Sequence, residues 1–247
     1  MGLLEDKVAV ITGAAGMIGR ATTAAFHREG AVVVGLDVRE QATDCEVFLT
    51  ADLSDEAQVA RAFAQIDDRF GRLDVLFSNA GVALPDDDNV LRTGIDVWQR
   101  TIAANLTSMF LVNKHGIPLM LRGGGGSLIN TASLLGSMGS AVPGIAYTAT
   151  KGAVLALTAD VAVEFARKGL RANTISPGPV ETPLFTTGLD EAGRQRRLVH
   201  VPTGRFTEAA EIAESVVFLA SDRASHINGI DLKIDGGMSV AYVTPEE

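Results

Sequence analysis

Short apolar runs alternate with longer amphipathic stretches along the whole 247-residue chain, and this feature constrains the fold most. The alternation is typical of a parallel sheet whose strands are joined by crossover helices. The run at 31–37 is so rich in valine that we expect a strand buried on both faces. The runs predict seven strands, at 7–12, 31–37, 46–50, 73–78, 127–132, 171–176 and 232–234.

The amphipathic stretches predict helices at 17–29, 54–70, 96–121, 145–168 and 207–220. Ser54 is the expected N-cap of the second helix, with Asp55 and Glu56 in a first turn where the helix dipole favours acids. No internal repeat or linker divides the chain. Residues 1–247 therefore predict a single doubly wound, Rossmann-type α/β domain, a parallel seven-stranded sheet flanked by helices.

One segment, 179–206, lacks strong periodicity and contains Pro179, Pro183 and Pro202. Long connections in compact domains are usually functional, and a loop leaving the carboxyl end of a strand overlooks the ligand crevice of a doubly wound sheet. We interpret 179–206 as a substrate lid. Its three neighbouring arginines, at 194, 196 and 197, are read as a solvated helix face rather than an anion site.

The composition excludes several classes of function. A net charge of −9 argues against nucleic acid or an anionic membrane as partner, and no apolar run approaches the ~20 residues of a membrane span. The single cysteine, Cys45, allows no internal disulfide, and the beginning of the chain lacks a signal-peptide layout, so we expect a cytoplasmic protein. The four histidines have no metal-ligand spacing, and the run 86–88 of aspartates is read as a solvated turn; no metal is expected.

Residues 12–19, Thr-Gly-Ala-Ala-Gly-Met-Ile-Gly, join the first predicted strand to the first helix. Small residues let the backbone approach a pyrophosphate, which the helix N-terminus stabilises. Asp37 ends the next strand, eighteen residues past Gly19, where a carboxylate can accept hydrogen bonds from adenosine ribose hydroxyls and repel a 2′-phosphate. This arrangement favours NAD, although Arg39 could contact a 2′-phosphate.

These residues and several motifs after them make the chain resemble the short-chain dehydrogenase/reductase family, in its branch of about this length. The resemblance covers essentially the whole chain. The matched motifs are Thr12, Gly13 and Gly19 of the glycine turn, Asp52-Leu53, Asn79-Ala80-Gly81, Asn105, Ser133, Tyr147-x-x-x-Lys151 and Pro177-Gly178 with Thr182. The family's middle glycine falls on Met17, with Gly16 just before it, so we expect reshaped cofactor binding at this turn.

The resemblance implies a set of site residues. The implied catalytic residues are Ser133, Tyr147, Lys151 and Asn105. The implied cofactor-binding residues are Thr12, Gly13, Gly16, Met17, Ile18, Gly19, Asp37, Asp52, Leu53, Asn79, Ala80, Gly81, Tyr147, Lys151, Pro177, Gly178, Val180 and Thr182. The implied substrate pocket is Leu134, Leu135, Met138, Ile145, Leu184 and Phe185, whose apolar character points to a hydrocarbon or ring portion of the substrate.

The chemistry requires a group that takes a proton from an alcohol or returns it. Tyrosine is poor at this near neutrality, because its unperturbed pKa is about 10. Lys151 lies four residues after Tyr147, on the same helix face, where an ammonium is expected to lower the pKa of the phenol. By resemblance, Lys151 also holds the nicotinamide ribose, Ser133 contacts the substrate oxygen and Asn105 seats a relay water.

Three functions remain open at this point. The leading hypothesis is an NAD-dependent dehydrogenase that interconverts a secondary alcohol and a ketone. An NADPH-dependent reductase of 3-oxoacyl groups on acyl carrier protein is the alternative, although Asp37 and the acidic chain count against it. A non-catalytic cofactor sensor is less expected, because Tyr147 and Lys151 are both present. The resemblance also implies a homotetramer, with contacts at the helix ending near Lys168 and at 239–247.

Overall fold

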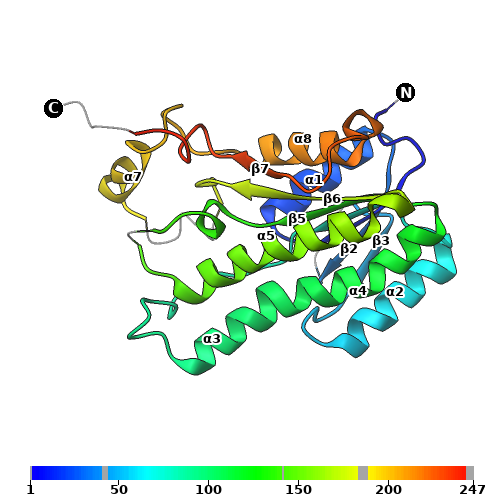
Figure 1. Cartoon of the computed structure of the whole chain (residues 1–247), viewed down its shortest axis with the longest axis horizontal. Helices are drawn as coiled ribbons and strands as arrows, with labels where there is room; N and C mark the ends of the chain where they lie inside the picture. The colour runs from blue at the N-terminus through cyan, green and yellow to red at the C-terminus, as the bar shows by residue number, and fades with distance from the viewer. Residues whose placement is uncertain (1, 41–43, 141, 183–188, 243–247) are drawn as a thin grey trace.

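A computed structural model of the chain describes residues 2–40, 44–140, 142–182 and 189–242. In it, seven strands form one parallel sheet, as predicted, in the order β3-β2-β1-β4-β5-β6-β7 (Figure 1). The strands are β1 (Val8–Thr12), β2 (Val32–Asp37), β3 (Val47–Thr50), β4 (Val75–Ser78), β5 (Gly126–Thr131), β6 (Leu170–Pro177) and β7 (Asp231–Ile234).

Helices cover both faces of this sheet (Figure 1). On one face lie α1 (Met17–Arg28) and α8 (Ala209–Ala220), which pack against each other. On the other face lie α2 (Glu56–Phe70), α4 (Ser108–Arg122) and α5 (Ile145–Phe165), and α3 (Ile95–Ile102) precedes α4. A short helix, α7 (Glu191–Leu198), lies within the predicted lid.

The core is divided in two by the sheet, because successive strand residues point to opposite faces. Ala9 and Ile11 of β1 pack in the cluster that contains Phe26 of α1, whereas Val8 and Val10 pack in the cluster that contains Phe63 of α2. Every residue of β1 is therefore buried. This explains why the strand runs are continuously apolar rather than alternating.

The predicted helix at 96–121 forms as one helical run from α3 to α4, but it is not α-helical throughout. A π-helical turn, Ala103–Thr107, separates α3 from α4 and contains the buried residue Asn105. Such single π-turns add a residue to the helix and occur often at functional sites. The apolar periodicity of the sequence does not reveal the extra residue, because both flanking segments keep a helical pattern.

Two predicted helix starts also need correction. The N-cap of α2 is Asp55, whose carboxylate accepts from the amides of Ala57 and Gln58, while the Ser54 hydroxyl donates to Asp52 at 2.7 Å. The helix predicted from Thr207 begins at Ala209 instead. Its capping box pairs Glu208 with Glu211, so a glutamate rather than a threonine fixes the start of α8.

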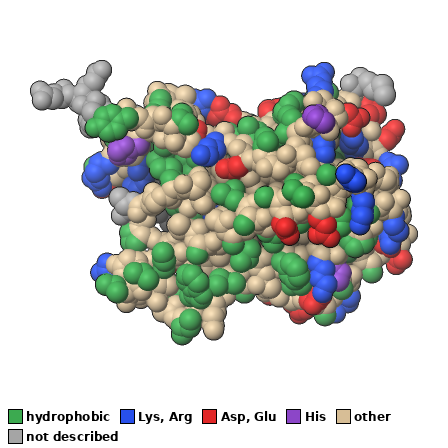
Figure 2. Space-filling view, viewed as in Figure 1, with side chains coloured by type: hydrophobic (Ala, Val, Ile, Leu, Met, Phe, Trp, Pro, Cys, Tyr) green, Lys and Arg blue, Asp and Glu red, His purple; other side chains and the backbone are tan. Residues whose placement is uncertain are grey.

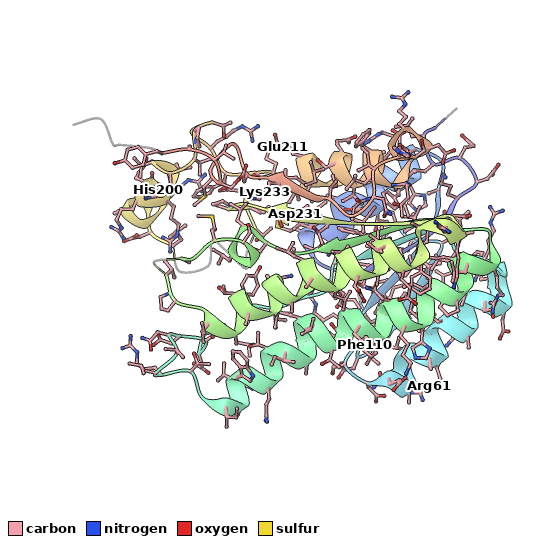
Figure 3. The ribbon with its side chains drawn as sticks, viewed as in Figure 1. Arg61, Phe110, His200, Glu211, Asp231 and Lys233 are labelled. Carbon is pink, nitrogen blue, oxygen red and sulfur yellow. The ribbon has the colours of Figure 1, made fainter. Side chains whose placement is uncertain are left out.

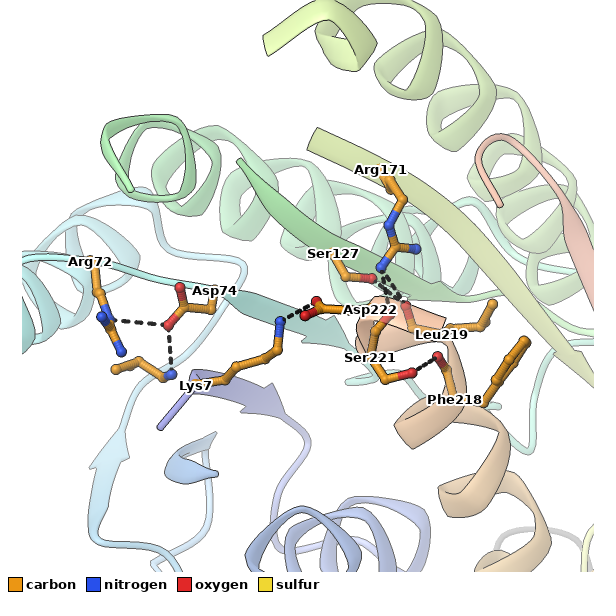
Figure 4. Close-up of polar contacts among 10 residues, drawn as sticks. Lys7, Arg72, Asp74, Ser127, Arg171, Phe218, Leu219, Ser221 and Asp222 are labelled. Carbon is orange, nitrogen blue, oxygen red and sulfur yellow. Dashed lines mark hydrogen bonds and ion pairs between the residues drawn. The ribbon is translucent and has the colours of Figure 1, made fainter. Parts of the chain in front are cut away.

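Polar contacts cover the end of the sheet at which its parallel strands begin (Figure 4). The Arg171 guanidinium donates to the carbonyls of Leu219 and Ser221 at 2.8 and 3.3 Å, and Ser127 Oγ also donates to Leu219 at 2.8 Å. Lys7 pairs with Asp222 at 2.8 Å. A cation beside the last carbonyls of α8 satisfies acceptors that the helix leaves open. The opposite end of the sheet, where the strands have their C-termini, remains available for a functional site.

Within the predicted lid, the structure describes 179–182 and 189–206. Arg194, interpreted as part of a solvated helix face, lies partly exposed on α7, and both its terminal nitrogens contact the Glu181 carboxylate, at 2.5 and 3.1 Å. Its guanidinium also lies over the Phe206 ring, 4.6 Å from the centroid. Arg194 therefore ties α7 to the segment that follows β6.

Candidate functional site

The glycine turn between β1 and α1 packs too tightly for larger residues at two positions. A Cβ on Gly19 would lie 2.2 Å from the Gly13 carbonyl oxygen. Gly13 itself has a φ of 66°, which favours glycine, and a Cβ there would lie 3.0 Å from Ala80 Cα. The turn therefore holds the start of α1 close to the ends of β1 and β4.

Met17 is the first residue of α1, and its side chain is 44% exposed. The N-cap is Gly16, which has no side chain to accept the first amides of the helix. Those amides have no partner inside a helix, so they can bind an anion such as a pyrophosphate. Met17 therefore stands partly exposed at the start of α1, where the family has its middle glycine.

Asp37 is buried at the end of β2, where its carboxylate fastens the glycine turn. Oδ2 accepts from the Ala15 amide at 3.1 Å, and Oδ1 accepts from the Arg39 amide at 3.0 Å. The exposed Arg39 guanidinium lies 3.5 Å from the same Oδ1. An acid and a base thus stand side by side at the end of β2.

The next two predicted cofactor residues differ in exposure. Asp52 is exposed, and its Oδ1 accepts from the amide and hydroxyl of Ser54. Leu53 is buried in the core, so its side chain is not open to a ligand. Ile18 packs beside the other core cluster.

Thr12 acts inside the protein rather than at its surface. Its buried Oγ1 accepts from the amides of Asn79 and Ala80, at 2.9 and 3.1 Å, which fixes the end of β4 to the end of β1. Gly81 follows, where a Cβ would lie 3.3 Å from Asn105 Oδ1 and 3.6 Å from Lys151 Nζ. Glycine at this position leaves an approach to both side chains.

Three of the predicted catalytic side chains meet at the ends of β5 and α5. The Ser133 side chain lies beside the Tyr147 hydroxyl and, as a hydrogen-bonding neighbour, opposes the rise in the pKa of that phenol. Lys151 Nζ donates to the Thr131 carbonyl at 2.8 Å and lies 5.5 Å from the centroid of the Tyr147 ring. Ser133 comes from the end of β5, and the helix places Tyr147 and Lys151 one turn apart.

Asn105, the fourth predicted catalytic residue, lies in the π-turn between α3 and α4. Its Oδ1 accepts from the Val82 amide at 2.7 Å, and its Nδ2 donates to the Val82 carbonyl at 2.9 Å and to Thr150 Oγ1 at 3.3 Å. These bonds join the loop after β4 to α5. Asn105 thereby stands within reach of the space beside Gly81 and Lys151.

Burial governs the titration of the two central groups. It raises the pKa of Tyr147, which the hydrogen bond with Ser133 partly offsets, and it lowers the pKa of Lys151 to about 8. The sequence predicts instead that the Lys151 ammonium lowers the pKa of the phenol. That prediction is wrong for the protein alone, because loss of hydration disfavours charge on both side chains.

Lys151→Met is expected to stabilise the protein at pH 7 by about 2 kcal/mol. A fall in pKa from 10.5 to about 8 corresponds to roughly 3 kcal/mol, less about 1 kcal/mol for the bond to Thr131. The unfolded chain holds the lysine proton up to its ordinary pKa, so the gain is complete below pH 8 and shrinks as pH rises towards 10.5. Urea unfolding at pH 7 and pH 10 measures it. The exposed Lys168→Met is the control, and an equal effect of both variants would contradict the burial cost.

The remaining predicted residues come, in the sequence, after β5 and β6 or at the start of α5. Pro177 ends β6, the Gly178 amide donates to the Ile234 carbonyl, and Val180 is buried. Thr182 closes a tight turn onto the Val180 carbonyl. Of the predicted pocket, Leu134 is buried, Leu135 and Ile145 are half-buried and Met138 is exposed. Leu184 and Phe185 lie outside the described residues.

One residue at the site was missed. Asp87 belongs to the run interpreted as a solvated turn, yet it is only 9% exposed and accepts from the amides of Ala146 and Tyr147. No local signal separates it from Asp86 and Asp88, because its partners lie about sixty residues away.

Within the described ranges, no three His, Cys, Asp or Glu side chains come together as metal ligands. No helix in the part of the chain that the structure covers has the length and apolarity needed to cross a membrane.

Comparison with known proteins gives consistent matches. A family model described as enoyl-(acyl carrier protein) reductase matches residues 13–239. An uncharacterized oxidoreductase of Bacillus subtilis is 42% identical, covering 99% of this chain and 95% of the relative. A 3-oxoacyl-[acyl-carrier-protein] reductase of Thermotoga maritima is 35% identical (96% and 99% covered), and a cis-4-hydroxycyclohexanecarboxylate dehydrogenase of Sinomonas cyclohexanicum is 38% identical (94% and 96%).

The crystal structure of levodione reductase superimposes with a TM-score of 0.89 at 35% identity, covering 97% of this chain and 100% of that one. The similarity thus extends over the entire fold, including the glycine turn, the site at the strand ends and α8. The chain belongs to the short-chain dehydrogenase/reductase family and is an oxidoreductase of that family.

Proposed function

We propose that the protein transfers a hydride between NAD(H) and a secondary alcohol or ketone, with Tyr147 as general acid and base. The observation that carries the proposal is the grouping of three side chains: Ser133 lies beside the Tyr147 hydroxyl, and Lys151 is one helical turn away. The group lies at the end of the sheet where the strands have their C-termini, as does the glycine turn. A phenol beside a second hydroxyl and a buried amine can exchange a proton with an alcohol.

The residues present fit a nicotinamide dinucleotide. The uncapped start of α1 suits the pyrophosphate, Asp37 suits the ribose hydroxyls, and the space that Gly81 leaves beside Lys151 suits the second ribose. The bound cofactor supplies the hydride acceptor or donor. We further propose that Pro177, Gly178 and Thr182 line its nicotinamide end.

The proton is handled by the chain's own side chains. Tyr147 takes it from the substrate hydroxyl, or returns it to a ketone, while Ser133 donates a hydrogen bond to the substrate oxygen. Donors fixed at a position of developing charge stabilise the transition state. A Lys151 pKa of about 8 suits proton exchange near neutrality, and Asn105 continues the path towards solvent through a water.

For the substrate, we propose an alcohol or ketone with a hydrocarbon or ring portion. Leu135, Met138 and Ile145 offer apolar surface near Ser133 and Tyr147. One relative acts on a hydroxycyclohexane carboxylate, according to its name. We infer that the chain is one catalytic domain, that 179–206 acts as the lid, and that the single cysteine, Cys45, suits a reducing cytoplasm.

Reduction of 3-oxoacyl groups on acyl carrier protein is the second candidate function. A relative with that name favours it, and Arg39 could meet the 2′-phosphate of NADPH. The Asp37 carboxylate and the net charge of −9 count against it, since an acidic carrier is repelled. A non-catalytic sensor role is the least favoured, because the tyrosine and lysine are both in place.

The test is turnover of a panel of cyclic and acyclic secondary alcohols, their ketones and a 3-oxoacyl thioester, with NAD(H) and NADP(H) in parallel. We expect activity with NAD(H) on alcohols and ketones. Activity confined to NADPH and the thioester would establish the second function, and cofactor binding without turnover of any substrate would favour the sensor.

The protein is also expected to be a homotetramer. Apolar side chains gather on the face over α3, α4 and α5, including Phe110, 51% exposed, and Val163, 81% exposed (Figures 2 and 3). Exposed apolar patches mark association surfaces. Light scattering after gel filtration should give four times the 25.9 kDa chain mass. Phe110→Glu should reduce the mass, and a monomeric wild type would overturn the expectation.

A further inference from the structure

We propose that Asp87 is a positioning residue that holds the start of α5, and with it the backbone of Tyr147, at the working distance from the substrate. The proposal rests on the proposed function, because it assigns Asp87 a role through the catalytic tyrosine. Asp87 itself contacts no reacting atom; it acts on the helix that carries Tyr147 and Lys151.

The first amides of α5 are all bound by one loop. Asp87 Oδ1 accepts from the Ala146 amide at 3.1 Å, and Oδ2 accepts from the Tyr147 amide at 2.8 Å. The Asp88 carbonyl accepts from the Ile145 amide at 3.0 Å. These three amides are among the four that a helix cannot satisfy internally, and the N-cap, Gly144, has no side chain. A residue from outside the helix therefore replaces its local cap.

The loop that supplies this cap is itself held in place. The Asp87 amide donates to the Leu84 carbonyl at 3.1 Å, and the Thr93 hydroxyl donates to Asp87 Oδ1 at 3.4 Å. The Asp88 amide donates to Thr93 Oγ1 at 2.9 Å, and the Asp88 carboxylate pairs with Arg92 at 2.8 Å. Asp87, Asp88 and Thr93, which we call the clamp, thus connect α5 to the segment following β4, which also carries Gly81 and Val82 of the site.

Because the clamp binds only the first turn of α5, it controls the position of Tyr147 rather than that of Lys151. Tyr147 is the third residue of α5, so its amide is in the turn that Asp87 binds, whereas Lys151 is one turn further and is held by Thr131. Loss of the carboxylate would release the first turn and leave the rest of the helix packed. A small displacement of a catalytic group lowers turnover strongly while leaving binding intact.

Asp87 also places a negative charge at the start of the helix that carries the Tyr147 phenol. The charged groups of this loop are Asp86, which is exposed, Asp87, and the Asp88–Arg92 pair. On α5 itself, Lys151 lies one turn after Tyr147, and the other charged residues, Asp160 and Glu164, lie near the far end of the helix. The described segment after β5, which packs on α5, contains Ser133 but no charged side chain up to Ser140. A carboxylate at the helix start opposes the dipole that would otherwise favour the phenolate. Its removal should ease ionisation of Tyr147.

The test compares Asp87→Asn with Asp86→Asn, which removes the same charge from the neighbouring exposed residue. The Asp87 variant keeps the shape but loses one acceptor. We expect kcat to fall about 10- to 100-fold with the Kd for NAD unchanged within about twofold. We also expect the acid limb of the pH profile of kcat/KM to move down by about half a unit. The Asp86 variant should match the wild type in all three quantities.

A second measurement does not depend on turnover. Amide hydrogen exchange in Asp87→Asn should accelerate in the first turn of α5, 145–148, and remain unchanged in its last turns. Unchanged exchange there would overturn the proposal, and so would a wild-type kcat and pH profile in a folded Asp87→Asn. If the wild type turns over no alcohol or ketone, the proposed function fails, and the exchange experiment still decides whether Asp87 holds the helix.

Discussion

Tyr147→Phe is expected to lower kcat for alcohol oxidation by about 10³-fold, because general acid–base catalysis contributes roughly 10²- to 10⁴-fold. The substitution removes only the hydroxyl that lies beside Ser133. The ring stays half-buried beside Lys151, so the site keeps its shape. The Kd for NAD should stay within about twofold, which separates a loss of chemistry from a loss of binding.

The chain supplies its own control for this prediction. It contains two tyrosines, and the other, Tyr242, is 94% exposed. Tyr242→Phe should have the turnover of the wild type. Initial rates under saturating cofactor and a binding titration of both variants make the comparison. Retention of more than about a tenth of the activity by Tyr147→Phe would contradict its assignment as acid and base.

Asp37→Asn is expected to reduce the preference for NAD over NADP, measured as the ratio of kcat/KM values, by about 100-fold. Two effects add. The amide removes the repulsion between a buried carboxylate and the 2′-phosphate, and like charges at a contact cost several kcal/mol. It also frees Arg39, whose guanidinium lies 3.5 Å from Asp37, to meet that phosphate.

A double variant separates the two effects. In Asp37→Asn with Arg39→Ala, the repulsion is gone but the guanidinium is also absent, so the gain with NADP should be smaller than in the single variant. Asp52→Asn removes an exposed charge at the end of the neighbouring strand and should leave the ratio unchanged within about twofold. An unchanged ratio in Asp37→Asn would show that Asp37 only fastens the turn through Ala15.

The sheet and the glycine turn could be predicted from the sequence because local patterns determine them. The central strands β1 and β2 are apolar runs buried on both faces, and the crossover rule leaves few ways to order such strands. The requirement for Gly13 and Gly19 follows from contacts within one short turn. The same locality explains why the strand bounds were close to those observed.

The errors arise where distant residues decide the structure. The π-turn around Asn105 depends on Val82 and Thr150, and the role of Asp87 depends on a helix start about sixty residues away. The pKa of Tyr147 depends on burial by the whole fold, whereas the sequence shows only that Lys151 is one turn away. Leu53 belongs to the Asp52-Leu53 motif that matches the family, but its side chain is part of the core.

The most direct test of hydride transfer uses a secondary alcohol that carries deuterium on its carbinol carbon. The wild type is incubated with this alcohol and NAD, and the reduced cofactor is analysed by mass spectrometry and NMR. We expect one deuterium, on the nicotinamide ring and on one face of it. Reduced cofactor without deuterium, or ketone formed without any reduced cofactor, would contradict the proposed function.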